Sequence, residues 1–273
     1  MLIKIDHSTS YQYDTEANYS IQSLRLTPQP VDGQRILSWN IHVEGNNILD
    51  GFTDSFGNLT HTLVISKPHK SICIRVQGEI ETSDTNGVVS GGLELFPEIF
   101  YLRETSQTIA NQAIIEQAEK AEQGTENILD CLHYLMGSIR STIDYQTGQT
   151  HANTTAAEAI QNASGVCQDH AHVFLSAARY LDIPARYISG YLLHSDTGEE
   201  SEASHAWAEA FVPDLGWVGF DVSNNVCVNE MYVRVAIGLD YHDAAPVRGV
   251  RRGGEGEKLT VSVHVNQVGE AAQ

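Results

Sequence analysis

The sequence predicts an α+β protein in which a small all-β domain precedes a domain of helices packed on an antiparallel sheet. Apolar and polar residues alternate over much of the first hundred residues, a helical period begins after Tyr101, and alternation returns after Pro184. Helices followed by strands are typical of an α+β domain. We therefore expect residues 1–100 to form the β domain and residues 101–273 the second domain.

The β domain is predicted from two alternating runs and one turn. Gly57-Asn58 interrupts the chain between Phe52 and Leu63 and indicates a turn. The alternating apolar positions are Leu37, Trp39, Ile41 and Val43 in one run and Ile72, Ile74 and Val76 in the other.

Four helices are expected between Tyr101 and Pro184. The fourth carries an apolar stripe from Ala171 to Leu181, which places Cys167 in or just before its first turn. The first helix is expected to start at Thr105 or Ser106 and to end at Gly124. The second is expected to have Thr125 as its N-cap, and the third to begin with the capping box Thr155–Glu158.

Three strands are expected beyond Pro184, at Arg186–Leu193, His205–Val212 and Trp217–Val222. The short connection between the last two predicts an antiparallel hairpin, with Asp221 opposite a residue between His205 and Glu209. A His–Asp hydrogen bond is feasible there only in the right register. Arg248–Lys258 has the composition of a loop, and a final strand follows from Leu259 to Val265.

Composition excludes several classes of protein. With 16 Lys+Arg against 35 Asp+Glu, the net charge of −19 disfavours nucleic-acid and anionic-membrane partners. The N-terminal residues lack the apolar core of a signal peptide and no run is long enough for a membrane span, so a cytoplasmic location is expected. The four cysteines form no CxxC pair, which disfavours disulfides and structural zinc. No EF-hand pattern indicates calcium, and no cofactor or metal is expected.

Three residues have the local settings that nucleophilic catalysis requires. Cys167 lies at a helix start, where the helix dipole favours a thiolate. His205 and Asp221 lie on the two strands of the expected hairpin. An imidazole can take the thiol proton, and a carboxylate orients and stabilises that imidazole.

Three blocks around these residues resemble the bacterial transglutaminase-like proteins, which are papain-like cysteine enzymes. The blocks are Gly165–His172 with Leu181–Leu192, Ser204–Trp207, and Gly219–Asp221. The resemblance covers residues of about 100 to 250, and the preceding β region is similar to the N-terminal domain of that family. Gly238–Tyr241 resembles a further segment that often has Arg where this chain has Leu239.

The resemblance implies that Cys167 is the nucleophile, His205 the general base and then acid, and Asp221 the orienting carboxylate. It implies a cysteine-dependent amide hydrolase or acyltransferase acting on peptides, isopeptides or glutamine-type carboxamides through a thioester. The backbone N–H of Cys167 is the expected oxyanion donor. Further oxyanion or substrate-contact candidates are Tyr145, Gln168 and Trp207.

Other interpretations stay open. A non-catalytic binding or scaffold module that retained the fold is one alternative, although the intact triad argues against it, because loss of activity imposes no demand for all three residues. A plain peptidase acting on protein chains would share the site and differ only in the shape of the cleft. A metal site is suggested by the group Cys167, Asp169, His170 and His172. At this spacing, however, the side chains do not lie on one face of the helix. The acidic run Glu199–Glu202 is interpreted as a solvated loop, or alternatively as a lid or a selector for basic substrates. The remaining cysteines, Cys73, Cys131 and Cys227, are expected to be packing residues.

Overall fold

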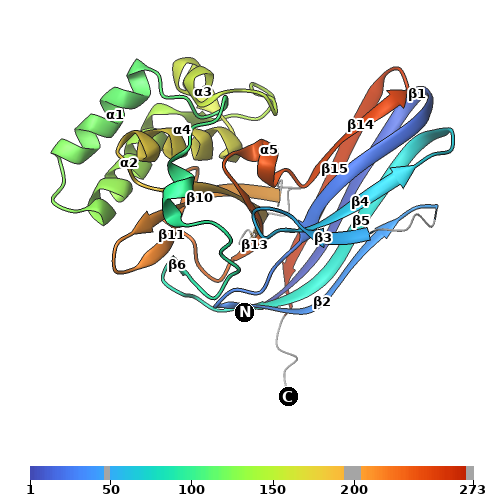
Figure 1. Cartoon of the computed structure of the whole chain (residues 1–273), viewed down its shortest axis with the longest axis horizontal. Coiled ribbons are helices and arrows are strands. Elements are labelled where there is room, and N and C mark those ends of the chain that lie inside the picture. The colour runs from blue at the N-terminus through green and yellow to red at the C-terminus, as the bar shows by residue number, and fades with distance from the viewer. Residues whose placement is uncertain (46–49, 194–203, 269–273) are drawn as a thin grey trace.

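The computed structural model describes residues 1–45, 50–193 and 204–268. It has two lobes, one containing the helices and the other made of long strands (Figure 1). None of the described helices has the length and apolar character needed to cross a lipid bilayer.

The strand lobe is an antiparallel sheet built around β1 (Leu2–Thr27), a strand long enough to have different neighbours along its two halves. The sheet order is β2-β5-β1-β4-β3, which confirms the expected strands and the turn at Gly57. The other strands are β2 (Gln34–Val43), β3 (Asp50–Thr53), β4 (Leu59–Ile65) and β5 (His69–Thr82).

Two strands from the far end of the chain complete this sheet. β14 (Val247–Gly253) and β15 (Glu257–Gln267) both pair antiparallel with β1. The expected loop at Arg248–Lys258 is therefore wrong, because its arginines and glycines form strand β14 and the turn after it. Both segments were also assigned to the second domain, but they pair with β1 in the sheet of the first. Pairing with residues more than 200 positions away leaves no local signal.

The helical lobe packs its helices on one antiparallel sheet of order β12-β11-β10-β9-β13, with β6 (Val88–Val89) beside β11. The helices are η1 (Glu98–Leu102), α1 (Gln112–Gln123), α2 (Ile128–Thr142), α3 (Ala156–Asn162), α4 (Cys167–Tyr180) and α5 (Tyr241–Ala244). The strands are β9 (Ala185–Leu192), β10 (Ser204–Val212), β11 (Gly216–Asp221), β12 (Val226–Cys227) and β13 (Tyr232–Gly238), and β7 (Asp144–Tyr145) pairs in parallel with β8 (Ser164–Gly165).

The capping box of α3 is confirmed, but the first two helices begin later than expected. Asn111 caps α1 and Asn127 caps α2, each accepting a backbone N–H with its side chain. Thr105 instead makes a local turn with Thr108, and the Thr125 hydroxyl donates to the carbonyl of Ala121 at the end of α1. Ser and Thr side chains form hydrogen bonds in turns as readily as at helix caps, so their presence alone does not locate a helix start.

Helix α4 is the centre of the helical lobe. Its side chains Phe174, Leu175 and Ala178 are fully buried, and the helix packs on β9 and β10. The apolar cluster around it also includes Ile3 and Ile5 of β1, so one core joins the two lobes. Burial of this stripe fixes the position of the first turn of α4, and with it Cys167.

Candidate active site

Cys167 is the first residue of α4. The backbone N–H of Val166 donates to Asp169 Oδ2 at 2.8 Å, which closes the first turn from its N-terminal side. A side chain at Gly165 would meet Asp169 Cβ at 2.6 Å, so this tight approach requires glycine. Among the hydrogen bonds of the described residues, none uses the backbone N–H of Cys167. That N–H remains available at the positive end of the helix.

His205 and Asp221 meet across the β10–β11 hairpin. Its register pairs Ala208 with Phe220, which places Asp221 opposite Trp207 and on the same face as His205. His205 Nε2 lies 2.6 Å from Asp221 Oδ2, and both side chains are buried. The hairpin predicted from the sequence therefore has the register that a His–Asp contact needs.

The Asp221 carboxylate accepts five hydrogen bonds. Oδ2 accepts from His205, Tyr232 and Asn224 Nδ2, and Oδ1 accepts from Ser223 and the Asn224 backbone. Burial alone raises the pKa of such a group, but these donors and the imidazole outweigh it and hold the pKa well below its usual range. Asp221 is thus a fixed negative charge behind His205.

His205 contacts the thiol as well as the carboxylate. Its Nε2 is occupied by Asp221, and the Cys167 side chain is close enough to the ring to raise the pKa of the imidazole. Burial lowers the pKa of the imidazole, yet the Cys167 charge and the Asp221 contact outweigh burial and raise the pKa to about 10. The imidazolium form therefore persists at neutral pH.

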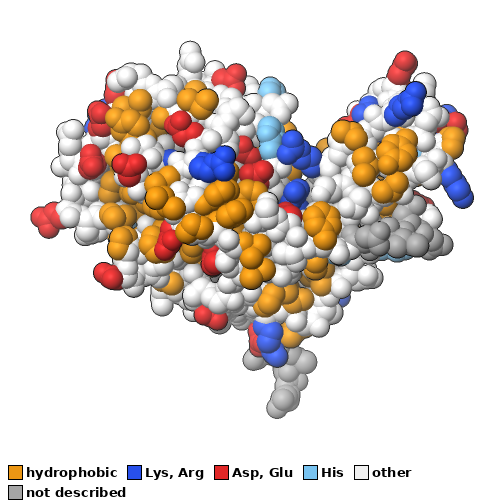
Figure 2. Space-filling view, viewed as in Figure 1, with side chains coloured by type: hydrophobic (Ala, Val, Ile, Leu, Met, Phe, Trp, Pro, Cys, Tyr) orange, Lys and Arg blue, Asp and Glu red, His pale blue; other side chains and the backbone are white. Residues whose placement is uncertain are grey.

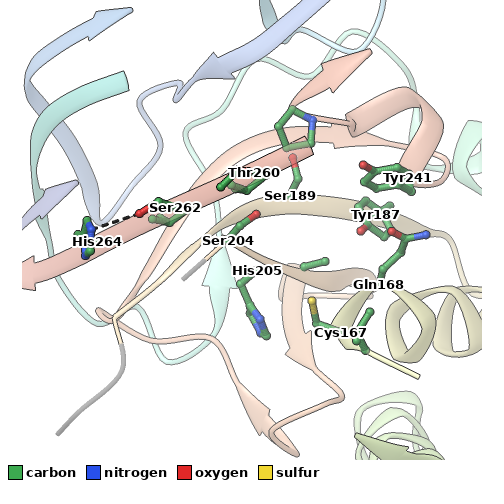
Figure 3. A pocket seen from close by; sticks show the side chains of 15 residues that line it. Cys167, Gln168, Tyr187, Ser189, Ser204, His205, Tyr241, Thr260, Ser262 and His264 are labelled. Atoms are coloured by element: carbon green, nitrogen blue, oxygen red, sulfur yellow. Dashed lines mark hydrogen bonds between the residues drawn. The ribbon is translucent and has the colours of Figure 1, made fainter. Parts of the chain in front are cut away.

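One pocket is lined by both Cys167 and His205, and we call it the thiol pocket. Its volume is about 510 Å³. Figure 3 shows Cys167 at the start of α4 with His205 beside it, and β15 running across the opposite side. The lining residues are Val166, Cys167, Gln168, Tyr187, Ser189, Ser204, His205, Ala206, Tyr241, Pro246 and Thr260 to His264.

Several of these lining residues were missed by the sequence reasoning. Tyr187 lies on a predicted strand, and the period-two alternation of that strand could have indicated the face on which Tyr187 lies. Tyr241 ends the segment Gly238–Tyr241, in which the Leu239 side chain is buried. No local pattern points to Thr260 or Ser262, because β15 reaches the site only through its pairing with β1.

The other sequence candidates lie in different places. Gln168 lines the thiol pocket, and its side chain also donates to the carbonyl of Ala152 at 3.4 Å. Tyr145 stacks on His170 beside the strand that leads to Cys167, and it is not among the described lining residues. Trp207 lies buried behind His205, in an apolar cluster rather than on the pocket wall, so a direct substrate contact by Trp207 is not supported.

The two neighbouring histidines are used for internal contacts. The ring nitrogens of His170 lie 2.9 Å and 3.1 Å from the carbonyl oxygens of Val166 and Ile143. His172 accepts the backbone N–H of Tyr241. No group of possible metal ligands occurs among the described residues. The acidic run Glu199–Glu202 lies outside the described residues.

The fold and site define an α+β protein with a Cys–His–Asp arrangement at a helix N-terminus. The Transglutaminase-like superfamily matches residues 115–222, and the Bacterial transglutaminase-like N-terminal region matches residues 3–81. The chain therefore has a transglutaminase-like core behind a bacterial transglutaminase-like N-terminal region. The expected resemblance and the expected α+β fold class are confirmed.

Two relatives match this chain in sequence, and one solved structure matches its fold. An uncharacterized protein of Mycobacterium leprae is 28% identical over 97% of this chain and 99% of its own length. An uncharacterized protein of Mycobacterium tuberculosis is 25% identical over 96% of this chain and 91% of its own. The crystal structure of a candidate cysteine protease from Cytophaga hutchinsonii superimposes with a TM-score of 0.79 at 21% identity, covering 100% of this chain and 92% of that one.

Proposed function

We propose that this protein is a cysteine-dependent amide hydrolase or acyltransferase in which Cys167 is the nucleophile. The observation that carries the proposal is the position of His205, which contacts the Cys167 side chain and the Asp221 carboxylate at the edge of one pocket. The substrate class is a peptide, an isopeptide or a glutamine-type carboxamide.

In the first half-reaction the Cys167 thiolate attacks the amide carbonyl carbon, and the carbonyl electrons move to the oxygen. The backbone N–H of Cys167 donates to this oxyanion, and Gln168 is the candidate for the second donor because it lines the pocket. The His205 imidazolium gives its proton to the leaving nitrogen, the C–N bond breaks, and ammonia or an amine departs. A thioester remains on Cys167.

In the second half-reaction neutral His205 takes a proton from the incoming nucleophile. Water gives a carboxylic acid, and an amine gives a new amide; in both cases the C–S bond breaks and the thiolate returns. We favour hydrolysis, because water is always present and no group on the described pocket wall identifies an amine-acceptor site.

Labelling with iodoacetamide near neutral pH tests whether the thiol is activated. We expect Cys167 to react far faster than the other three cysteines, and His205→Ala to remove this selectivity. Cys227→Ser is the matched control, since Cys227 is partly buried and burial raises the pKa of its thiol. Equal labelling of all four cysteines would contradict an activated nucleophile and favour the scaffold alternative.

Mass spectrometry of peptide pools then identifies the reaction. Pools treated with wild-type protein are compared with pools treated with Cys167→Ala. Deamidation, cleavage and conjugation each change the mass differently, so the product names the outcome. No Cys167-dependent change in any peptide pool would overturn the proposed function.

A further inference from the structure

A second cavity adjoins the thiol pocket, and Tyr241 lines both. Its volume is about 430 Å³, and its walls come from both lobes. We call it the arginine pocket. Its lining residues are Tyr11, Gln22, Ala152, Asn153, Tyr241, His242, Ala245, Val247 to Arg251, and Glu257. Figure 2 shows Lys/Arg and His side chains gathered around the hollow between the lobes.

The charge of this cavity is opposite to that of the chain as a whole. The chain has a net charge of −19, yet Arg248, Arg251 and Arg252 fall within five positions of β14. Arg251 is committed internally: it donates to the carbonyl of Gly254 and lies 3.2 Å from Glu257. Glu257 is thereby neutralised, and one positive charge is left on the wall.

That charge is Arg248. Within the described part of the chain its guanidinium makes one hydrogen bond, from Nη1 to the carbonyl of His242 at 2.9 Å, and no carboxylate lies within ion-pair distance. Asp243 is near Arg248, but its carboxylate already accepts the backbone N–H of Leu239, and burial raises its pKa although Arg248 opposes that rise. Arg248 is exposed, lines the cavity and has further N–H donors beyond the one that bonds His242.

We propose that the arginine pocket is a substrate subsite, in which Arg248 binds the carboxylate of an acidic residue in the peptide whose amide lies at Cys167. This inference rests on the proposed function and names its substrate class as acidic peptides. A guanidinium matches a carboxylate with two parallel hydrogen bonds, which gives orientation as well as affinity. Tyr241 belongs to both cavities, so a peptide extended past it contacts both at once.

Because the protein as a whole is negatively charged, Arg248 gives this cavity a local preference for acidic side chains. Screening limits the repulsion from distant carboxylates to about 8 Å at physiological salt. An acidic side chain therefore experiences Arg248 mainly after it has entered the cavity. Peptides without a carboxylate at this position gain no compensating contact.

The first experiment maps the modified sites in proteome-derived peptide pools for wild type, Arg248→Glu and Arg252→Glu. Arg252 is the matched control: it lies on the same strand and is exposed, but it does not line the cavity and is four residues, or about 13 Å, from Arg248. We expect wild type and Arg252→Glu to enrich Asp or Glu at one fixed position, and Arg248→Glu to lose that enrichment or replace it by Lys or Arg.

Kinetics on one matched peptide pair give the size of the effect. The two peptides differ only in having Glu or Gln at the enriched position. Both have an amidated C-terminus, so that the side chain is the only carboxylate tested. A third peptide with a free C-terminal carboxylate tests whether Arg248 binds the chain terminus instead of a side chain. Because partly exposed ion pairs contribute up to about 1 kcal/mol, we expect kcat/KM for the Glu peptide to fall about fivefold in Arg248→Ala. Turnover of the Gln peptide, which has no charge at this position, should fall less than that of the Glu peptide.

Binding separates failure of the subsite from failure of the chemistry. An acetylated, amidated hexapeptide with one Glu is titrated into Cys167→Ala and into Cys167→Ala/Arg248→Glu. We expect at least fivefold weaker binding to the double variant. Equal binding, or modified sites with no acidic preference, overturns the subsite even if the enzyme is active. Absence of turnover with intact Arg248-dependent binding overturns the proposed reaction alone.

Discussion

Replacing Asp221 by Asn tests how the carboxylate acts on His205. The two oxygens of Asp221 face two separate sets of donors, with His205 and Tyr232 on one oxygen and Ser223 and the Asn224 backbone N–H on the other. An amide has only one oxygen, so its NH₂ group must face one of these sets. The substitution keeps the volume but removes the charge and one acceptor.

The magnitude follows from the lost hydrogen bond. A hydrogen bond to a charged group contributes about 1.5–3 kcal/mol, which corresponds to roughly one to two pKa units on His205. Acylation should therefore slow by roughly 10- to 100-fold. In wild type the pKa of His205 is raised to about 10, so the imidazolium that protonates the leaving group is lost only as the pH rises through that value. In the variant this alkaline limb should move roughly one to two pH units lower.

The assay is the pH profile of kcat/KM for a peptide found in the pools, measured for wild type, Asp221→Asn and Asp54→Asn. Asp54 is the matched control, a largely buried carboxylate paired with Arg25 at 2.9 Å in the strand lobe. It should change stability without moving the alkaline limb. An unchanged limb in Asp221→Asn, or an equal shift in Asp54→Asn, would refute the assignment of Asp221 as the residue that sets the pKa of His205.

Two further predictions concern the sheet that supports the site. Glu209 is fully buried between Arg186 and Arg234, so Glu209→Ala should cost about 3–5 kcal/mol and lower the Tm by roughly 10 °C. Burial opposes ionisation of Glu209, but the two arginines outweigh burial and lower its pKa. The difference in unfolding free energy between wild type and Glu209→Ala should therefore shrink as the pH falls below about 4.5. A Cβ at Gly190 would lie 2.1 Å from the Val233 carbonyl oxygen, so Gly190→Ala should lower the free energy of unfolding by about 3 kcal/mol, as measured by thermal unfolding. Gly137→Ala in α2 is the control and should be neutral or stabilising. Equal Tm values for the two glycine variants, or a pH-independent Glu209→Ala difference, would contradict these assignments.

Local sequence patterns predicted the parts of the site that depend on short segments. The apolar stripe of α4 placed Cys167 at the helix start, and the tight connection after His205–Val212 placed Asp221 on a neighbouring strand. The register still had to bring both side chains to one face, and a sequence alone leaves that open. The His–Asp contact was thus predicted as feasible, and the structure supplies its geometry.

The parts that sequence reasoning missed depend on distant pairing. β14 and β15 have few buried side chains, so their composition resembles a loop followed by an isolated strand. What makes them part of the first sheet is hydrogen bonding to β1, which no residue-by-residue pattern records. The arginine pocket was missed for the same reason, because Arg248 and Tyr241 acquire a common cavity only in three dimensions.

The position of β15 has a consequence for the order in which the thiol pocket is completed. Translation releases Cys167, His205 and Asp221 before residues 260–264, which form the remaining wall of the thiol pocket. A nascent chain therefore carries Cys167 while one side of the thiol pocket is still absent. The chain must therefore be complete, and β15 paired with β1, before the thiol pocket has all of its walls.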